Sequence, residues 1–360
     1  MNRARLVGVV ALFALAGCSQ GTPAAAPSAP SASSTSSAAT PAASAPAGFA
    51  SGDVRISLVR QLSSGDYFEQ WLAGAQAEAK ALNVKLEVSS GDGNNDKQAL
   101  NLEQAVTSKS DAIIVDHGFA QTVQPAIKKA ADAKIPLVAF DVDPGTPGAI
   151  TLDQDDHQIA EQALGALKAD TGGSGEVVYV YVAGFAPLDR RDETWNRFKK
   201  DNPGIKQVAQ IGVVNSSTAS AVADQAKAAL QAHPGAKAIF APYDEFAKGA
   251  ALAVKELGLG DKVKIYGADV STADIGVITE PGSPWVATSA TDPSNVGRVA
   301  VRAAALLVAG SQVEHKLTVP PTLITQKGLR DAGITGVEQL TKAFPSLATP
   351  DVARVPWAAS

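Results

Sequence analysis

The chain is poor in cysteine and has no excess of positive charge. Its 360 residues contain a single cysteine, Cys18, so the rest of the sequence cannot form disulfides, supply a catalytic thiolate or bind zinc through cysteine. Lysine and arginine total 31 against 36 acidic residues, which gives a formal net charge of −5. No basic cluster stands out, and nucleic acid is therefore not expected as a partner.

Histidine is also scarce, and the sequence motifs typical of enzymes are missing. The four histidines include no pair at the helical spacing of metal ligands, and no G-x-S-x-G, P-loop or G-x-G-x-x-G motif occurs. Residues 92–96 with Glu103 imitate a calcium-binding loop, but Lys97 occupies the position that needs glycine. We therefore expect Asp96 to cap a helix, and we expect no metal, no cofactor and no enzymatic activity.

Long apolar runs are absent except for a short one near the start. Residues 6–16 are apolar and follow Arg3 and Arg5, which is typical of a signal peptide and too short to span a bilayer. The run ends in Leu15-Ala16-Gly17-Cys18, which matches the lipobox of bacterial lipoproteins. We expect residues 1–18 to be a lipoprotein signal peptide and Cys18 to be acylated, anchoring the protein to the extracytoplasmic face of the cell membrane.

The next segment lacks the residues needed to build a core. Residues 19–48 are almost wholly Ser, Ala, Pro, Thr and Gly, with no charged or aromatic side chain. Such a segment cannot bury enough apolar surface to offset its ordering entropy, so a disordered tether is predicted over residues 19–52. Residues 53–350 remain, which is enough for two domains of ordinary size.

Short β-branched runs alternate with helical patterns throughout the remaining chain. This alternation predicts βαβ units, parallel sheets and an α/β fold. The predicted strands are 54–60, 84–88, 112–116, 136–140, 177–182, 208–213, 238–241, 263–267 and 285–288. The predicted helices are 68–82, 98–107, 123–133, 156–171, 192–201, 219–232, 246–257 and 295–308.

Several predicted strands finish on polar residues directly before a helix. These strand ends are residues 116–117, 141–143, 183–185, 243–245 and 269–271. Ligands of open parallel sheets bind outside the carboxyl ends of the strands, so we expect these loops to converge on one site.

A series of short segments resembles the ribose- and galactose-type solute-binding proteins of bacterial ABC importers, which have the type I periplasmic-binding fold. In family order these segments are Tyr67-Phe68, residues 74–76, residues 135–141, residues 182–184 with Arg191, residues 239–245, residues 267–269 and residues 293–297. The resemblance implies two Rossmann-like lobes joined by a three-segment hinge, with the ligand between them. By this analogy lobe 1 is 53–153 plus 292–318, and lobe 2 is 154–291 plus 319–350.

The resemblance also implies which residues contact the ligand. Asp141, Arg191 and Asp269 stand at positions of ligand-binding residues, although each Asp could instead cap the next helix and Arg190 could replace Arg191. Tyr67 and Phe68 match ring-stacking positions, but Phe68 also fits the apolar stripe of its helix.

Four further positions depart from the ribose type. Asp116 and Tyr243 stand where an amide is typical, Thr291 where a glutamine is typical, and Val142 where an arginine is typical. Loss of that arginine removes a donor beside Asp141, so ribose bound in the usual pose is not expected. The acceptor-rich cleft suits a neutral polyhydroxylated ligand such as a sugar or polyol and should repel a carboxylate or phosphate.

The resemblance implies a monomeric protein that captures a small ligand by hinge closure and passes it to an ABC permease in the membrane. Two alternatives remain open at this point. A sensor subunit that delivers the same ligand class to a membrane receptor would use the same clamp. A hydrolase is disfavoured because no base and nucleophile stand together in the sequence.

Overall fold

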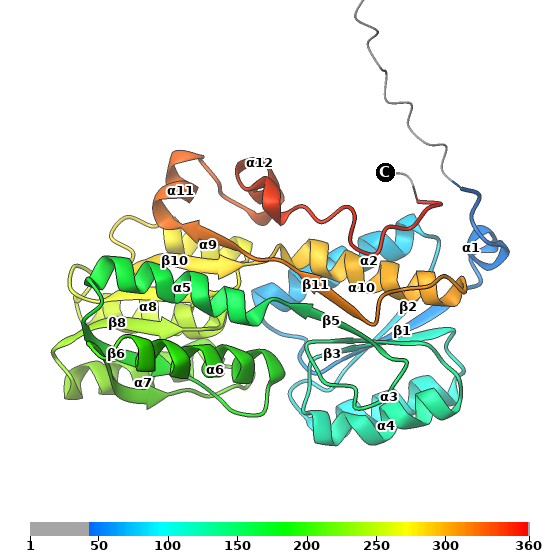
Figure 1. The fold of residues 1–360 in the computed structure, drawn as a ribbon, viewed down its shortest axis with the longest axis horizontal. Helices are drawn as coiled ribbons and strands as arrows, with labels where there is room; N and C mark the ends of the chain where they lie inside the picture. Colours follow the sequence, from blue (N-terminus) through cyan, green and yellow to red (C-terminus); the bar gives the residue numbers. More distant parts are fainter. Residues whose placement is uncertain (1–42, 359–360) are drawn as a thin grey trace, which may run out of the picture. The chain divides into compact units, whose positions relative to one another are not determined.

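The structure is a computed structural model that describes residues 43–358, and these residues form one compact unit. The predicted signal peptide, Cys18 and residues 19–42 of the predicted tether lie outside the described residues. Two six-stranded sheets, each flanked by helices, make up the fold (Figure 1). We call the elements around the first sheet lobe 1 and those around the second sheet lobe 2.

The sheet of lobe 1 is entirely parallel and has the order β11-β5-β4-β3-β1-β2. Its strands are β1 (Arg55–Arg60), β2 (Lys85–Ser90), β3 (Ala112–Asp116), β4 (Leu137–Phe140), β5 (Ile150–Gln154) and β11 (Lys316–Val319). Its helices are α2 (Asp66–Ala81), α3 (Asn95–Thr107), α4 (Ala120–Asp132) and α10 (Pro293–Val308).

The sheet of lobe 2 has the order β12-β10-β9-β8-β6-β7 and is parallel except for β12, which pairs antiparallel with β10. Its strands are β6 (Gly175–Val180), β7 (Ile205–Ile211), β8 (Ala236–Ala241), β9 (Lys264–Ala268), β10 (Trp285–Ala290) and β12 (Thr322–Thr325). Its helices are α5 (Asp156–Thr171), α6 (Ala186–Asp201), α7 (Thr218–Ala232), α8 (Asp244–Glu256), α9 (Thr272–Thr279) and α11 (Gln326–Asp331).

Both faces of each sheet are buried under helices, which explains why the central strands are apolar runs rather than alternating ones. In lobe 1, Ile56 and Leu58 face the α2 and α10 side, where Trp71 packs, whereas Val59 faces α3 and α4. In lobe 2 the α7 and α8 side and the α5 and α6 side form two separate cores in the same way. The predicted α/β class with parallel sheets is confirmed.

The chain passes between the two sheets three times. These passages lie between β5 and α5, between β10 and α10, and between β11 and β12. The carboxyl ends of the strands in both lobes face the region between the sheets, which places the polar loops described above in the same neighbourhood (Figure 1).

The predicted tether is wrong at its C-terminal end. Residues 47–51 form helix α1, and Phe49 in this helix is buried against lobe 1. The Phe49 ring packs on Trp357 at a centroid distance of 5.1 Å, and the Ala43 amide donates to the Pro356 carbonyl at 2.9 Å. One aromatic residue together with the C-terminal segment therefore supplies the apolar contact that residues 43–52 lack on their own.

The C-terminal segment crosses from one lobe to the other. Helix α11, η1 (Val337–Gln339), α12 (Leu340–Ala343) and η2 (Pro345–Leu347) pack on the core of lobe 2, and Val352 to Trp357 then pack on the core of lobe 1.

Two smaller expectations need correction. The N-cap of α3 is Asn94, whose side chain accepts from the Lys97 amide, and Asp96 lies inside the first turn. Helix α6 begins six positions earlier than the predicted helix start at residue 192, which places both Arg190 and Arg191 on the helix. No helix among the described residues is long and apolar enough to cross a membrane.

Candidate functional site

A cavity lies between the two lobes at the carboxyl ends of their strands. It contains about 490 Å³ of space free of protein atoms, part of which is open to solvent. Residues of both lobes line it, namely Gln61, Leu62, Tyr67, Phe68, His117, Gln154, Phe185, Pro187, Leu188, Arg191, Val214, Tyr243 and Asp269.

The strand ends reach this region through unusual backbone turns. His117 follows β3, Asp141 follows β4 and Asp269 follows β9, and all three adopt left-handed conformations with φ of 58°, 51° and 67°. Asp and His tolerate this conformation better than most side chains do. The turns redirect the chain so that the side chains of His117 and Asp269 line the cavity.

Arg191 and Asp269 form a buried, two-pronged ion pair in the wall of the cavity. Arg191 Nη1 and Nη2 donate to Asp269 Oδ2 and Oδ1 at 3.0 and 3.1 Å, and Arg191 Nε donates to Asp156 at 2.8 Å. Burial would lower the pKa of Arg191, but the carboxylates of Asp269 and Asp156 hold that pKa above its usual value. This fork fixes two charged groups in the lining of the cavity.

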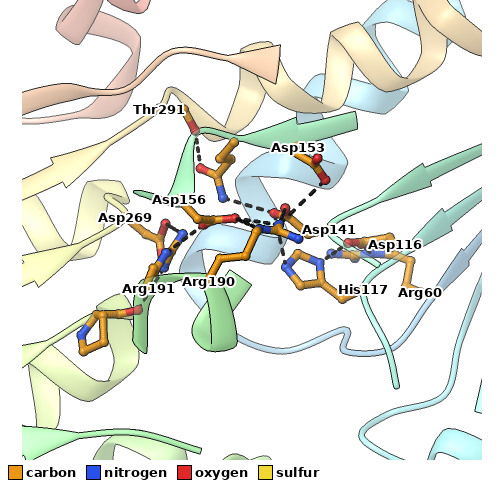
Figure 2. A network of polar contacts seen from close by, with 12 residues as sticks. Arg60, Asp116, His117, Asp141, Asp153, Asp156, Arg190, Arg191, Asp269 and Thr291 are labelled. Atoms are coloured by element: carbon orange, nitrogen blue, oxygen red, sulfur yellow. Dashed lines mark hydrogen bonds and ion pairs between the residues drawn. The ribbon is translucent and has the colours of Figure 1, made fainter. Parts of the chain in front are cut away.

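Arg190, the neighbour of Arg191, reaches a different partner across the cleft. Its Nη2 donates to Asp141 Oδ1 in lobe 1 at 2.8 Å, and its Nε donates to Asp156 Oδ2 in lobe 2 at 2.8 Å (Figure 2). The second oxygen of Asp141 accepts from Gln154 at 3.3 Å, and Gln154 in turn accepts from Thr291. Burial first, and the nearby Asp156 carboxylate second, raise the pKa of Asp141 to about 7.

A second buried ion pair stands behind the cavity in lobe 1. Asp116 accepts from Arg60 Nε at 2.9 Å and lies 2.6 Å from His117 Nδ1. Although burial opposes it, the hydrogen bond from His117 and the charge of Arg60 hold the pKa of Asp116 below its usual value. Asp116 thus orients His117, whose ring faces the cavity.

More than half of the cavity lining is apolar or aromatic. Phe185 and Leu188 belong to the core of lobe 2, and Val214 and Tyr243 pack against the cores of both lobes. Leu62, Tyr67 and Phe68 contribute from lobe 1, and the rings of Phe68 and His117 meet edge to face at 5.2 Å. The cavity therefore combines a polar part around Arg191, Asp269, Gln154 and His117 with an extended apolar part.

The structure divides the predicted site residues into two groups. Tyr67, Phe68, Arg191, Tyr243 and Asp269 line the cavity, whereas Asp116, Asp141 and Thr291 are buried behind it and are bound by other side chains. Val142 supplies no guanidinium beside Asp141, but Arg190 supplies one from the opposite lobe.

Several lining residues were not identified from the sequence. Gln154 ends β5, a strand that the pattern did not predict. Gln61 and Leu62 follow β1 and Val214 follows β7, and neither strand end was among the predicted strand-end loops. Phe185 belongs to the predicted strand-end loop 183–185, and this position was the one sequence signal that it could lie at the site. None of the described Asp, Glu and His residues gather into a group that could hold a metal ion.

Comparison with known proteins identifies the family. The model of the periplasmic binding protein domain matches residues 56–312, so the chain belongs to this family. The resemblance inferred from the sequence is thereby confirmed. The ribose import binding protein of Salmonella typhimurium is 26% identical over 278 residues, which cover 76% of this chain and 90% of the relative.

Two solved structures extend the comparison. A 5-methylthioribose transporter solute-binding protein from Thermotoga lettingae, in complex with 5-methylthioribose, is 43% identical with a TM-score of 0.82, covering 84% of this chain and 96% of that one. A solute-binding protein from Agrobacterium vitis with bound allitol is 27% identical with a TM-score of 0.71, covering 78% of this chain and 98% of that one.

Proposed function

We propose that this protein captures a small polyhydroxylated ligand in the cavity between its lobes and delivers it to an ABC importer. The observation that carries the proposal is the Arg191–Asp269 fork in the wall of a cavity lined by both lobes. Charged hydrogen-bonding groups of this kind bind hydroxyls more strongly than neutral groups do. The ABC-importer relatives of the chain support delivery to a permease.

The ligand carries an apolar group in addition to its hydroxyls. A bare sugar or polyol would leave much of the apolar surface formed by Leu62, Phe185, Leu188 and Val214 without a partner. The relative from Thermotoga lettingae, which is 43% identical, binds a pentose with a methylthio substituent. We therefore infer a methylthio-pentose or a similar alkyl-substituted sugar as the ligand class.

A binding screen tests the ligand class directly. The purified full-length chain in detergent is titrated calorimetrically with 5-methylthioribose, ribose, allitol and xylitol. We expect 5-methylthioribose to bind roughly 10- to 200-fold more tightly than ribose, the range that small apolar groups contribute in a matching pocket. Equal or tighter binding of ribose would refute the apolar-group assignment. Failure of every sugar and polyol to bind would refute the capture proposal itself.

Capture proceeds by closure of the two lobes around the ligand. A ligand that contacts both lobes at once binds the closed form better than the open form, and this difference in affinity shifts the population. Small-angle scattering should show a smaller radius of gyration when 5-methylthioribose is present at saturation. An unchanged radius with a tightly bound ligand would contradict closure.

Binding leaves the ligand unchanged. Arg191 and Asp269 are paired with each other and His117 is hydrogen-bonded to Asp116, and no activated nucleophile faces the ligand space in the part of the chain that the structure describes. Mass spectrometry of the ligand released after prolonged incubation should recover the starting compound. A sensor role would use the same cavity, and transport of the labelled ligand into cells that also express the cognate permease distinguishes import from sensing.

A further inference from the structure

Two adjacent arginines on α6 have different tasks. Arg191 is 2% exposed, lines the cavity and makes its side-chain contacts with residues of lobe 2. Arg190 does not line the cavity, and its guanidinium joins Asp156 of lobe 2 to Asp141 of lobe 1 (Figure 2). Arg191 is a candidate for ligand contact because it lines the cavity, and this reason does not apply to Arg190.

Asp141 does not line the cavity, and both of its carboxylate oxygens accept hydrogen bonds from other side chains. One carboxylate oxygen accepts from Arg190 at 2.8 Å and the other accepts from Gln154 at 3.3 Å, with His117 Nε2 3.8 Å away. The carboxyl group is fully buried. Since Gln154 ends β5 and accepts from Thr291, Asp141 is also tied to the passages that follow β5 and β10.

The contact between the lobes at Arg190 brings several carboxylates together around one guanidinium. Arg190 Nη2 lies 2.8 Å from Asp141, 2.6 Å from Asp156 and 3.7 Å from Asp153. Asp141 belongs to lobe 1 and Asp156 to lobe 2, so the approach of the lobes moves two like charges toward each other. A buried carboxylate left without its partner is strongly unfavourable.

Lys248 and Asp66 form another ion pair between the lobes in the described part of the chain, but here the carboxylate is not fully buried. Lys248 of α8 contacts Asp66 of α2 at 2.6 Å, but the Asp66 side chain is 38% exposed. Water can solvate that carboxylate when the pair is broken, and exposed pairs contribute little. Asp141 has no such access in the closed form.

We propose that Arg190 is a positioning residue for ligand capture, whose guanidinium neutralises Asp141 of lobe 1 and Asp156 of lobe 2 so that the lobes can close. The proposal depends on the capture function described above. Its consequence is that Arg190 sets the fraction of closed molecules even without ligand. Apparent affinity falls in proportion to the fraction of molecules in the binding-competent form, so loss of Arg190 weakens binding without removing a ligand contact.

Distance measurements on ligand-free protein test this role. Spin labels are placed at Lys128→Cys on α4 and Asp224→Cys on α7, two exposed positions in different lobes, in the full-length chain carrying Cys18→Ala. At about pH 8 we expect Arg190→Gln to lengthen the distance between the labels and to weaken binding of 5-methylthioribose roughly tenfold. Arg197→Gln is the matched control, because Arg197 lies on the same helix and pairs with Glu161 within lobe 2.

Two further results separate charge neutralisation from a general loss of structure. Adding Asp141→Asn to Arg190→Gln should restore the shorter distance, since no unpaired carboxylate then remains at position 141. The effect of Arg190→Gln should also fade at about pH 5.5, where Asp141, with its pKa raised to about 7, becomes protonated. His117, Asp153, Asp156, Arg190 and Arg191 are the charged groups that interact with Asp141, and protonation of His117 acts in the same direction.

Coinciding distances for Arg190→Gln and the unsubstituted chain at pH 8 would overturn the proposal, and so would failure of Asp141→Asn to restore the distance. If Arg190→Gln does not fold, Arg190→Ala replaces it, with the same expected direction relative to Arg197→Ala. Because these distances are measured without ligand, the outcome is independent of the sugar screen. The sugar screen can therefore refute capture while the distances support the role of Arg190. Equally, the distances can refute the role of Arg190 while the screen supports capture.

Discussion

Three non-glycine residues in left-handed conformations mark the functional end of the sheets. His117, Asp141 and Asp269 each follow a parallel strand. Glycine adopts the left-handed conformation most easily, so a position that only had to turn the chain would favour glycine. Residues in this conformation are frequent at ligand sites. Their strained backbone persists there because surrounding contacts stabilise it. Each of the three is also hydrogen-bonded through its side chain, which fixes the direction in which that side chain points.

Asp269 gives the most direct test of ligand contact. Asp269→Asn keeps the side-chain shape and the tolerance for a left-handed backbone, but it removes the negative charge. We expect ligand affinity to fall roughly 10- to 100-fold, because a hydrogen bond to a charged group is replaced by a neutral one. Calorimetry with the tightest ligand of the screen measures the change. Asp170→Asn, at a carboxylate that accepts from Tyr266 Oη away from the cavity, should leave affinity unchanged.

His117 should make stability depend on pH. Burial disfavours the charged ring, yet the hydrogen bond and charge of Asp116 raise the pKa of His117 above its ordinary value of 6.5. A raised pKa contributes stability that is fully present below the unfolded pKa and is lost as the pH rises through the folded pKa. His117→Gln should therefore lower the free energy of unfolding more at about pH 5.5 than at about pH 9.

Urea unfolding at the two pH values measures this difference. His157→Gln, at a half-exposed histidine that contacts Thr194, serves as the control. An equal loss at both pH values for His117→Gln would mean that the ring is neutral throughout and that Asp116 does not stabilise its charged form.

At the scale of elements, the central strands and the edge strands β2 and β7 were predictable, whereas β5, β11 and β12 were not. The buried strands β3, β4 and β8 are continuous apolar runs, which leave little ambiguity. Strands β5, β11 and β12 lie toward the edges of their sheets, have four or five residues, and owe their place to pairing partners far away in sequence. Helix α9 contains Gly276 and several β-branched residues, so its local propensity is low and tertiary packing determines it.

The missed start of α6 had consequences for the site. Pro187 was not recognised as a residue of the first turn, where proline is tolerated because its missing amide hydrogen has no partner in any case. With the helix starting at Ala186, Arg190 and Arg191 become successive helical residues that project in different directions. The sequence alone presents them as alternatives, whereas the structure uses both.

The packing of α2 on α10 depends on two glycines. A Cβ added at Gly297 would lie 2.1 Å from the Trp71 carbonyl oxygen, and one added at Gly74 would lie 2.0 Å from the Ser294 carbonyl oxygen. Gly297→Ala must therefore push the helices apart, which we expect to destabilise the protein by about 1–3 kcal/mol. Gly165→Ala on α5 meets nothing within 4 Å and should instead stabilise by about 0.5–1 kcal/mol. Thermal unfolding of both variants checks the opposite signs, and destabilisation by both would refute the packing argument.

At the scale of the whole molecule, the two ends of the described chain meet on lobe 1. Helix α1 and the segment around Trp357 cover each other there, away from the residues that line the cavity. Any tension transmitted through the preceding residues would reach lobe 1 before it reached the ligand. This arrangement is compatible with a protein held to a membrane at its N-terminal side while the cavity remains free to open and close.

The predicted anchor follows from residues outside the described structure and can be tested by itself. If the chain is cleaved before Cys18 and Cys18 is acylated, protein from a bacterial membrane fraction should begin at Cys18 and carry acyl chains, which intact-mass measurement detects. Cys18→Ala should abolish both changes and leave the protein with an intact leader, whereas Gln20→Ala should be processed normally. Ligand affinity should be the same for all three proteins, because residues 43–358 contain the entire cavity. Membrane-bound protein with an unmodified Cys18 would remove the lipid anchor from this account while leaving capture by the two lobes intact.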